Sequence, residues 1–145
     1  MFILRKKKMK TQIEINWLED MAFKGNPDGH ELIFDAEPHV GGKNQGPRPK
    51  QFMLYALAGC TGMDVVSILK KMRVEIEDLS VTVEAELTDE HPKHYIGMHV
   101  IYTFKGKDLP MKKLEKAVSL SEDRYCGVSV VYKKAMPVTS EIRIL

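Results

Sequence analysis

The stretch GPRPKQFMLYALAGCTGMDVV, residues 46–66, predicts the longest helix of the chain. Pro49 suits the first turn of a helix, because the N–H group that proline lacks has no partner there. The helix is expected to cover residues 49 to about 72, a length on the order of 35 Å. Its first half, residues 52–60, is apolar all round, which predicts a helix buried on every side. A domain with so few helices supplies little cover, so we expect a second subunit to complete it.

The residues before this helix predict strands joined by a turn. Residues 11–19 alternate apolar and polar side chains, which is typical of a half-buried strand. The sequence Asn-Pro-Asp-Gly at residues 26–29 is a turn signal, since proline presets φ and glycine tolerates positive φ. Residues 30–35 then close a hairpin, and residues 37–48, which show no periodicity, are expected to form a loop.

The residues after the helix predict an antiparallel hairpin, a second helix and a last strand. Apolar side chains alternate over residues 79–87 and 98–104, and a polar connection joins the two strands. The second helix is expected from Asp108 to about Asp123, with Cys126 at its C-terminal edge. Residues 128–134 fit a helix or a strand, and residues 137–145 predict the final strand. This order of elements predicts an α+β fold.

Length and composition indicate one soluble globular domain. The chain has 145 residues, of which 43% are hydrophobic and 29% charged. Residues 1–10 are expected to be a flexible basic leader, and residues 11–145 a single domain. The net charge is +2, but residues 5–8 supply four of the 22 basic residues, which leaves 18 against 20 acidic ones. The body of the protein is therefore not basic, and we expect no nucleic-acid partner.

The sequence also indicates the cellular location of the protein. No apolar run approaches the ~20 residues that cross a bilayer, so no membrane span is expected. The N-terminal basic residues are not followed by the apolar stretch of a secretory signal. We therefore expect a cytoplasmic protein, in which cysteines are normally kept reduced.

The motifs of the sequence leave two cysteines as the candidate catalytic residues. His91 and His94 are spaced like a weak metal-ligand pair without a second pair, so no metal site is expected. Phosphate-binding and hydrolase motifs are missing from the sequence, which leaves Cys60 and Cys126. Cys60 fits two roles: a buried small hydrophobic residue, or a reactive thiol beside the space that its small neighbours leave. Ionised Asp64, one helical turn on, would oppose thiolate formation, so a reactive Cys60 needs a cation from another element.

Two motifs resemble the OsmC/Ohr family of osmotically inducible and organic hydroperoxide resistance proteins. The first is Pro49 followed eleven residues later by Cys60, in an alanine-rich helix. The second is Cys-Gly-Val-Ser at residues 126–129, which resembles the family's second cysteine segment. The resemblance implies an OsmC-like fold with antiparallel sheets around a long central helix. It also implies an intertwined homodimer with active sites at the subunit interface.

The resemblance implies a thiol-dependent peroxidase that reduces organic hydroperoxides in an oxidative stress response. Cys60 would be the peroxidatic residue, oxidised to a sulfenic acid, and Cys126 the resolving residue that forms a disulfide with it. No bound cofactor is implied, since an external dithiol reductant, for which a lipoyl-type dithiol is a candidate, would reopen the disulfide.

The chain departs from the family pattern around these cysteines. Lys50 replaces a glutamate that holds a catalytic arginine in well-characterised members, and the first hairpin loop, assigned to Ala22–Gly25, offers only Lys24. Candidates for the activating cation are therefore Lys24, Arg48, Lys50 and Arg124. An alternative function stays open: an OsmC-like dimer without efficient peroxidase activity that binds a small apolar or thiol-reactive ligand at the subunit interface.

Overall fold

The computed structural model describes residues 8–145, which divide into two compact units, with the division of the chain between Pro49 and Lys50. Most of the predicted basic leader lies outside the described residues. Of its last part, Lys8, Met9 and Lys10 are exposed and belong to no helix or strand.

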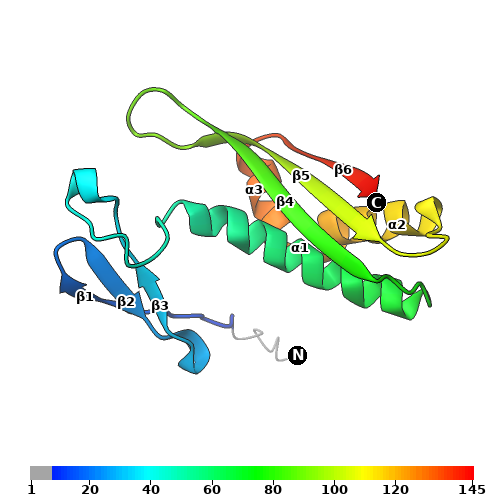
Figure 1. Cartoon of the computed structure of the whole chain (residues 1–145), viewed down its shortest axis with the longest axis horizontal. Coiled ribbons are helices and arrows are strands. Elements are labelled where there is room, and N and C mark those ends of the chain that lie inside the picture. Colours follow the sequence, from blue (N-terminus) through cyan, green and yellow to red (C-terminus); the bar gives the residue numbers. More distant parts are fainter. Residues whose placement is uncertain (1–7) are drawn as a thin grey trace, which may run out of the picture. The chain divides into compact units, whose positions relative to one another are not determined.

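The first unit is a three-stranded antiparallel sheet in the order β1-β2-β3 (Figure 1). Its strands are β1 (Ile15–Glu19), β2 (Ala22–Gly25) and β3 (Leu32–Phe34). The turn predicted at residues 26–29 is confirmed as a short 3-10 turn, Pro27–Gly29, that joins β2 to β3. The assignment of Ala22–Gly25 to a hairpin loop is wrong, because these residues form β2 and pair with both neighbouring strands. The turn between β1 and β2 lies at Asp20, whose φ is +45°.

The loop that follows β3 is held by one buried carboxylate. Asp35 is 3% exposed and accepts hydrogen bonds from the backbone N–H groups of Ala36, Lys43 and Gln45, at 2.7, 3.1 and 2.9 Å. The N–H of Gln45 contributes most to holding the pKa of Asp35 below its ordinary value. A short 3-10 helix, η2 (Pro38–Val40), is the regular element of this predicted loop.

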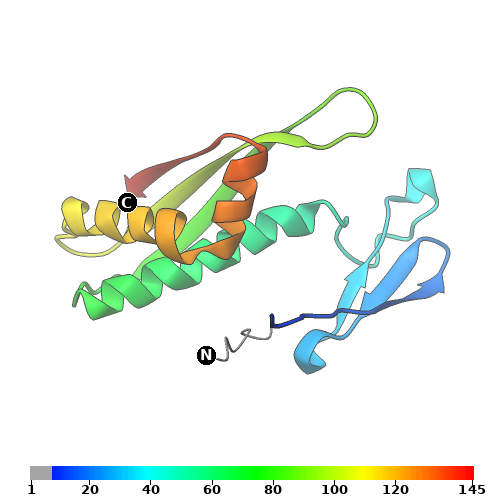
Figure 2. The same cartoon turned by 180° about the vertical axis from the view of Figure 1, so that it is seen from behind.

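The second unit packs three helices against a three-stranded sheet (Figures 1 and 2). The helices are α1 (Gln51–Lys71), α2 (Met111–Leu120) and α3 (Gly127–Ala135), and one π-helical turn, η3 (Ser121–Tyr125), follows α2. The strands are β4 (Asp78–Leu87), β5 (Tyr95–Lys105) and β6 (Val138–Ile144). The predicted α+β order is confirmed, and the ambiguous residues 128–134 lie in a helix.

Strand order explains how the helices come to share one face. β4 and β5 pair antiparallel, as predicted, with Val83 opposite Val100. β6 pairs parallel to β5, whereas antiparallel sheets were expected. A parallel pair needs a crossover connection, and α2, η3 and α3 supply it. In Figure 2 α2 and α3 lie in front of the strands.

The core lies where one stripe of α1 meets β5 and α2. On α1 this stripe is Leu57, Thr61, Val65 and Leu69, spaced four residues apart and each at most 1% exposed. The prediction that the first half of α1 is buried on every side is wrong for the single chain. Tyr55 is 66% exposed, because the sheet and the helices cover only one face of α1.

The length and composition of α1 match those of a membrane-spanning helix. The expectation that no segment reaches this length is therefore wrong for Gln51–Lys71. The core helix of a globular protein meets the same criterion, and the buried stripe of α1 packs in the core of the second unit. Length and apolarity alone therefore do not distinguish a membrane-spanning helix from a core helix.

Candidate active site

The structure brings the two predicted cysteines together. Cys60 Sγ, Cys126 Sγ and a carboxylate oxygen of Asp64 all lie within 4.8 Å of one another. Cys60 and Asp64 come from successive turns of α1, and Cys126 is the residue that precedes α3. Both cysteines are free thiols; Cys126 is fully buried and Cys60 is half-buried.

The break between α2 and α3 positions Cys126. Its backbone is extended, with φ −75° and ψ 101°, and its N–H donates to the carbonyl of Ser121 at 2.7 Å. Its Sγ caps α3 by accepting a hydrogen bond from the N–H of Ser129 at 3.3 Å. Burial, followed by the contact with Cys60, raises the pKa of the Cys126 thiol to about 11. Cys126 is therefore a protonated thiol at neutral pH.

A buried chain of three hydroxyl groups, those of Ser121, Thr61 and Tyr102, connects the half-buried carboxylates of Asp64 and Glu122. Ser121 Oγ donates to Asp64 Oδ2 at 3.0 Å and lies 2.8 Å from Thr61 Oγ1. Thr61 Oγ1 lies 2.6 Å from Tyr102 Oη, which donates to Glu122 Oε1 at 3.1 Å. Burial raises the pKa of Tyr102 well above its ordinary value, so its hydroxyl stays protonated.

Sequence reasoning missed this chain as part of the site, although each residue carried a signal. Thr61 is the polar residue of the buried stripe of α1, and Tyr102 lies on the apolar face of β5. Ser121 follows the apolar positions of α2 at helical spacing. The sequence showed each polar residue within an apolar pattern, but it did not show which side chains would form hydrogen bonds with it.

Two of the predicted activating cations lie in the second unit. Lys50 precedes α1, ten residues or about 15 Å of helical rise before Cys60, and its Nζ donates to the carbonyl of Lys93 at 3.2 Å. Arg124 is exposed on η3, two residues before Cys126. The structure therefore does not assign Lys50 to Cys60, and it leaves Arg124 at the surface.

The other two candidates lie in the first unit and have partners there. Lys24 forms an ion pair with Glu31. Arg48 Nη1 donates to Asn44 Oδ1 at 2.7 Å and to the carbonyl of Gly46 at 2.9 Å. These contacts give both side chains a structural role inside their own unit.

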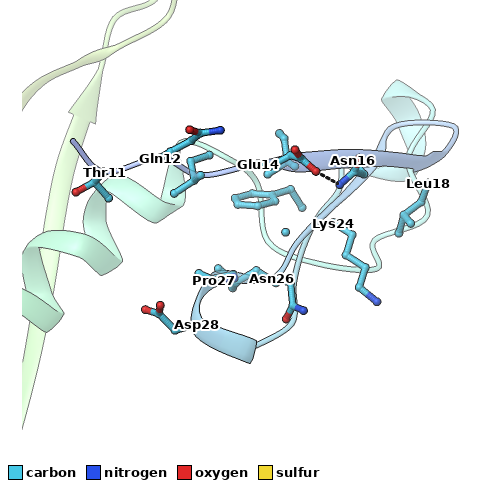
Figure 3. Close-up of a pocket in the computed structure, with 14 residues that line it drawn as sticks. Thr11, Gln12, Glu14, Asn16, Leu18, Lys24, Asn26, Pro27 and Asp28 are labelled. Carbon is cyan, nitrogen blue, oxygen red and sulfur yellow. Dashed lines mark hydrogen bonds between the residues drawn. The ribbon is translucent and has the colours of Figure 1, made fainter.

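The hollows of the molecule differ in character between the units. A hollow of about 740 Å³ belongs to the first unit, where Lys24, Pro27 and Asp28 border it together with apolar side chains (Figure 3). In the second unit a shallow groove of about 590 Å³ runs along α1, lined in part by Ala58, Gly59 and Gly62. These small neighbours of Cys60 were expected to leave space beside it, and the groove that they line does not include Cys60 itself.

Comparison with known proteins places these features in a family. The family model described as OsmC-like protein matches residues 42–141, a span that contains both cysteines, Asp64 and the buried chain. The chain belongs to the OsmC-like family. The resemblance read from Pro49, Cys60 and Cys126 is thereby confirmed.

Individual OsmC-like relatives support the assignment. Protein YhfA of Escherichia coli (strain K12) is 30% identical over 135 residues, which cover 92% of this chain and 98% of YhfA. A hypothetical protein from Aquifex aeolicus VF5 has a similar structure, with a TM-score of 0.80, 26% identity and coverage of 95% and 99% of the two chains. An organic hydroperoxide resistance protein OsmC and predicted redox protein from Legionella pneumophila shares the fold, with a TM-score of 0.69, 17% identity and coverage of 95% and 99%.

Proposed function

We propose that this OsmC-like protein is a thiol-dependent peroxidase that reduces organic hydroperoxides with Cys60 and Cys126. The observation that supports this function is the pair of free thiols, one buried and one half-buried, with sulfurs within 4.8 Å of each other. A disulfide between them requires the two sulfurs to approach to about 2.05 Å. The hydroperoxide resistance described for family members of the same fold agrees with this chemistry.

The reaction follows from the chemistry of the two thiols. The Cys60 thiolate attacks the oxygen of ROOH that is distal to the organic group, so that an S–O bond forms, the O–O bond breaks and an alcohol leaves. The sulfur of Cys126 then attacks the sulfenic acid of Cys60, an S–S bond forms and water leaves. An external dithiol, with a lipoyl-type dithiol as one candidate, supplies two electrons and two protons and restores both thiols. A reduced resting pair also fits the cytoplasmic location that we propose.

Exposed apolar surface supports a homodimer. On α1, Tyr55, Met63 and Val66 are 66%, 76% and 46% exposed, and in the first unit Ile13 and Trp17 are 74% and 64% exposed. Apolar patches of this kind are typical of subunit interfaces. We expect a second copy to bury more than ~2,000 Å² in total, the range of obligate interfaces. A monomer in sedimentation experiments at micromolar concentration would contradict this.

Thiol counting tests the peroxidase function. The reduced protein is mixed with cumene hydroperoxide, and the remaining thiols are counted over time. The proposal expects the rapid loss of two thiols per chain and the release of one cumyl alcohol. Oxidation no faster than that of an unfolded cysteine peptide would contradict it.

The departures from the family pattern favour a second candidate, a dimer that binds a small apolar or thiol-reactive ligand. The groove along α1 and the contact of Lys50 with the carbonyl of Lys93 support it. Under this alternative, cumene hydroperoxide leaves the thiols intact, whereas an apolar fluorescent probe binds to the reduced protein and protects Cys60 from alkylation.

A further inference from the structure

We propose that Asp64 is the proton acceptor of the thiol pair, taking the proton of Cys60 and then that of Cys126 and passing each to the departing oxygen. Its chemistry with peroxide rests on the proposed function, but its role as acceptor does not depend on peroxide. The geometry that points to it is the approach of one carboxylate to two thiols, all within 4.8 Å.

A carboxylate is a suitable partner for these thiols once it takes the proton. An ionised Asp64 opposes a thiolate beside it, but a protonated Asp64 is neutral and the opposition disappears. A base therefore activates a thiol without the cation that the sequence analysis required. Burial raises the pKa of the Cys126 thiol, so its attack on the sulfur of Cys60 needs a neighbouring base that takes its proton.

The buried chain has room for one additional proton. Four oxygen–oxygen contacts link Asp64, Ser121, Thr61, Tyr102 and Glu122, but the three hydroxyl groups supply only three protons. With both carboxylates ionised, one of the two contacts of Thr61 Oγ1 lacks a proton. A proton on Asp64 completes the series, because Asp64 then donates to Ser121, Ser121 to Thr61, and Thr61 to Tyr102. The chain thus stabilises the state in which Asp64 has accepted a proton.

The far end of the chain favours Asp64 over Glu122 as the place for this proton. Lys133 Nζ lies 3.9 Å from Glu122 Oε2 and 3.0 Å from Asp123 Oδ1, and its charge favours ionised partners. Asp64 appears in none of the ion pairs between described residues.

Beyond the two thiols, the titratable groups around Asp64 line the same hollow or are linked to it through the buried chain. Lys71 lines the same hollow of about 330 Å³, but it follows Asp64 by seven residues, or about 10 Å of helical rise. The groups from all packed elements are Cys60 and Lys71 on α1, Tyr125 and Glu122 on η3, Cys126 before α3, and Tyr102 on β5.

Each step then balances. Cys60 gives its proton to Asp64, its thiolate attacks ROOH, and the departing RO⁻ takes the proton from Asp64 to become ROH. Cys126 gives its proton to the regenerated carboxylate and attacks the sulfur of the sulfenic acid. The hydroxide that leaves takes this proton and departs as water, and Asp64 returns to its ionised form.

A peroxide-free experiment tests the acceptor role. The reduced protein, with a metal chelator present, is mixed with dithionitrobenzoate, which forms a mixed disulfide with the half-buried Cys60 and releases one coloured thiolate. Attack by Cys126 on this mixed disulfide releases a second, and its rate reports the loss of the Cys126 proton. The variants are Asp64→Asn, which keeps the shape of the side chain, and Asp123→Asn, a matched carboxylate that contacts Ser119 and Lys133.

In Asp64→Asn we expect the second release to slow by about 10²-fold or more and to rise in proportion to hydroxide concentration. The wild type and Asp123→Asn keep a fast second release with a shallower pH profile. An Asp64→Asn variant that is folded by circular dichroism and keeps the wild-type rate and pH profile would overturn the proposal.

Asp64→Ala provides a second route if the asparagine variant does not fold. Added formate is expected to accelerate its second release, because formate replaces the missing carboxylate, and no acceleration in the folded variant would overturn the proposal. The two proposals fail differently. If the wild type does not react with cumene hydroperoxide but its second release depends on Asp64, only the peroxidase function is contradicted. If the wild type turns over peroxide and its second release does not depend on Asp64, only the acceptor role is contradicted.

Discussion

Asp35 in the first unit is a buried carboxylate and Asp64 in the second a half-buried one, and their surroundings differ in kind. Asp35 receives three hydrogen bonds from backbone N–H groups, which are fixed in place and never give up their protons. Asp64 receives one hydrogen bond from a hydroxyl group and faces two thiols. A hydroxyl can rotate and a thiol can release its proton, so the second carboxylate has capacity for chemistry that the first lacks.

The difference shows that burial of an acid does not by itself mark a functional site. The N–H groups around Asp35 fix the loop that precedes α1, and the carboxylate acts as its organising centre. Asp64 accepts from Ser121, which is linked in turn to Thr61 and Tyr102, so hydroxyl groups from distant parts of the sequence form one connected chain. Transferable protons, rather than burial, separate the two roles.

The largest effect is expected from Cys60→Ser, which should abolish the consumption of cumene hydroperoxide. Serine has no thiolate at neutral pH, so the first attack cannot occur. Peroxide loss is measured over time, and circular dichroism checks that the variant is folded. Asp35→Asn is the control from the other carboxylate region and should oxidise at the wild-type rate when folded. Turnover by Cys60→Ser would remove Cys60 from the mechanism.

The next effect is expected from Cys126→Ser, which should react once with peroxide and then stop. Without a resolving thiol the sulfenic acid of Cys60 persists, and mass spectrometry should show the gain of one oxygen atom or a dimedone conjugate. The wild type should instead lose two thiols and gain no oxygen. If Cys126→Ser formed no sulfenic acid and turned over like the wild type, Cys126 would not be an obligatory resolving residue.

Much of the fold was readable from local pattern. Alternation and helical spacing predict the α+β order, and β2 was missed because Ala22–Gly25 is too short to show alternation. All-round apolarity of α1 indicates that every face needs cover, but it does not say what supplies the cover. The exposed Tyr55 lies on a face that this chain does not cover.

The site was only partly readable. The cysteine pair was predicted from the sequence and the family resemblance, whereas Asp64 was noted only as a neighbour whose charge would oppose a thiolate. The buried chain was not, because Thr61, Tyr102 and Ser121 are separated by up to 60 residues in the sequence and meet only when α1, β5 and η3 pack together. Pairing of buried polar groups is a property of tertiary structure, which local periodicity does not encode.

A smaller effect is expected from Tyr102→Phe, which removes the middle of the buried chain. Thr61 Oγ1 and Glu122 Oε1 each lose their contact with Tyr102, and a buried polar group left without its partner costs about 1–3 kcal/mol. Urea denaturation should show the unfolding free energy reduced by about this amount. Tyr125→Phe, at a position 62% exposed, is the control and should unfold like the wild type. Equal stability of Tyr102→Phe and the wild type would show that the chain contributes little to folding.

The smallest effect is the contribution of Asp35 to stability in acid. Its pKa is lowered in the folded state, first by the N–H of Gln45 and also by those of Ala36 and Lys43, so folding favours the ionised carboxylate. The contribution is therefore fully present above the unfolded pKa of about 3.9 and is lost as the pH falls through the lower folded pKa. Asp35→Asn should lose this part of the acid dependence, whereas Asp28→Asn, on the exposed turn of the same unit, should retain it. Urea midpoints measured from neutral pH down to about pH 3 distinguish the two variants. If the midpoint fell equally with pH in the wild type and in Asp35→Asn, the backbone donors would hold the loop without the charge of the carboxylate.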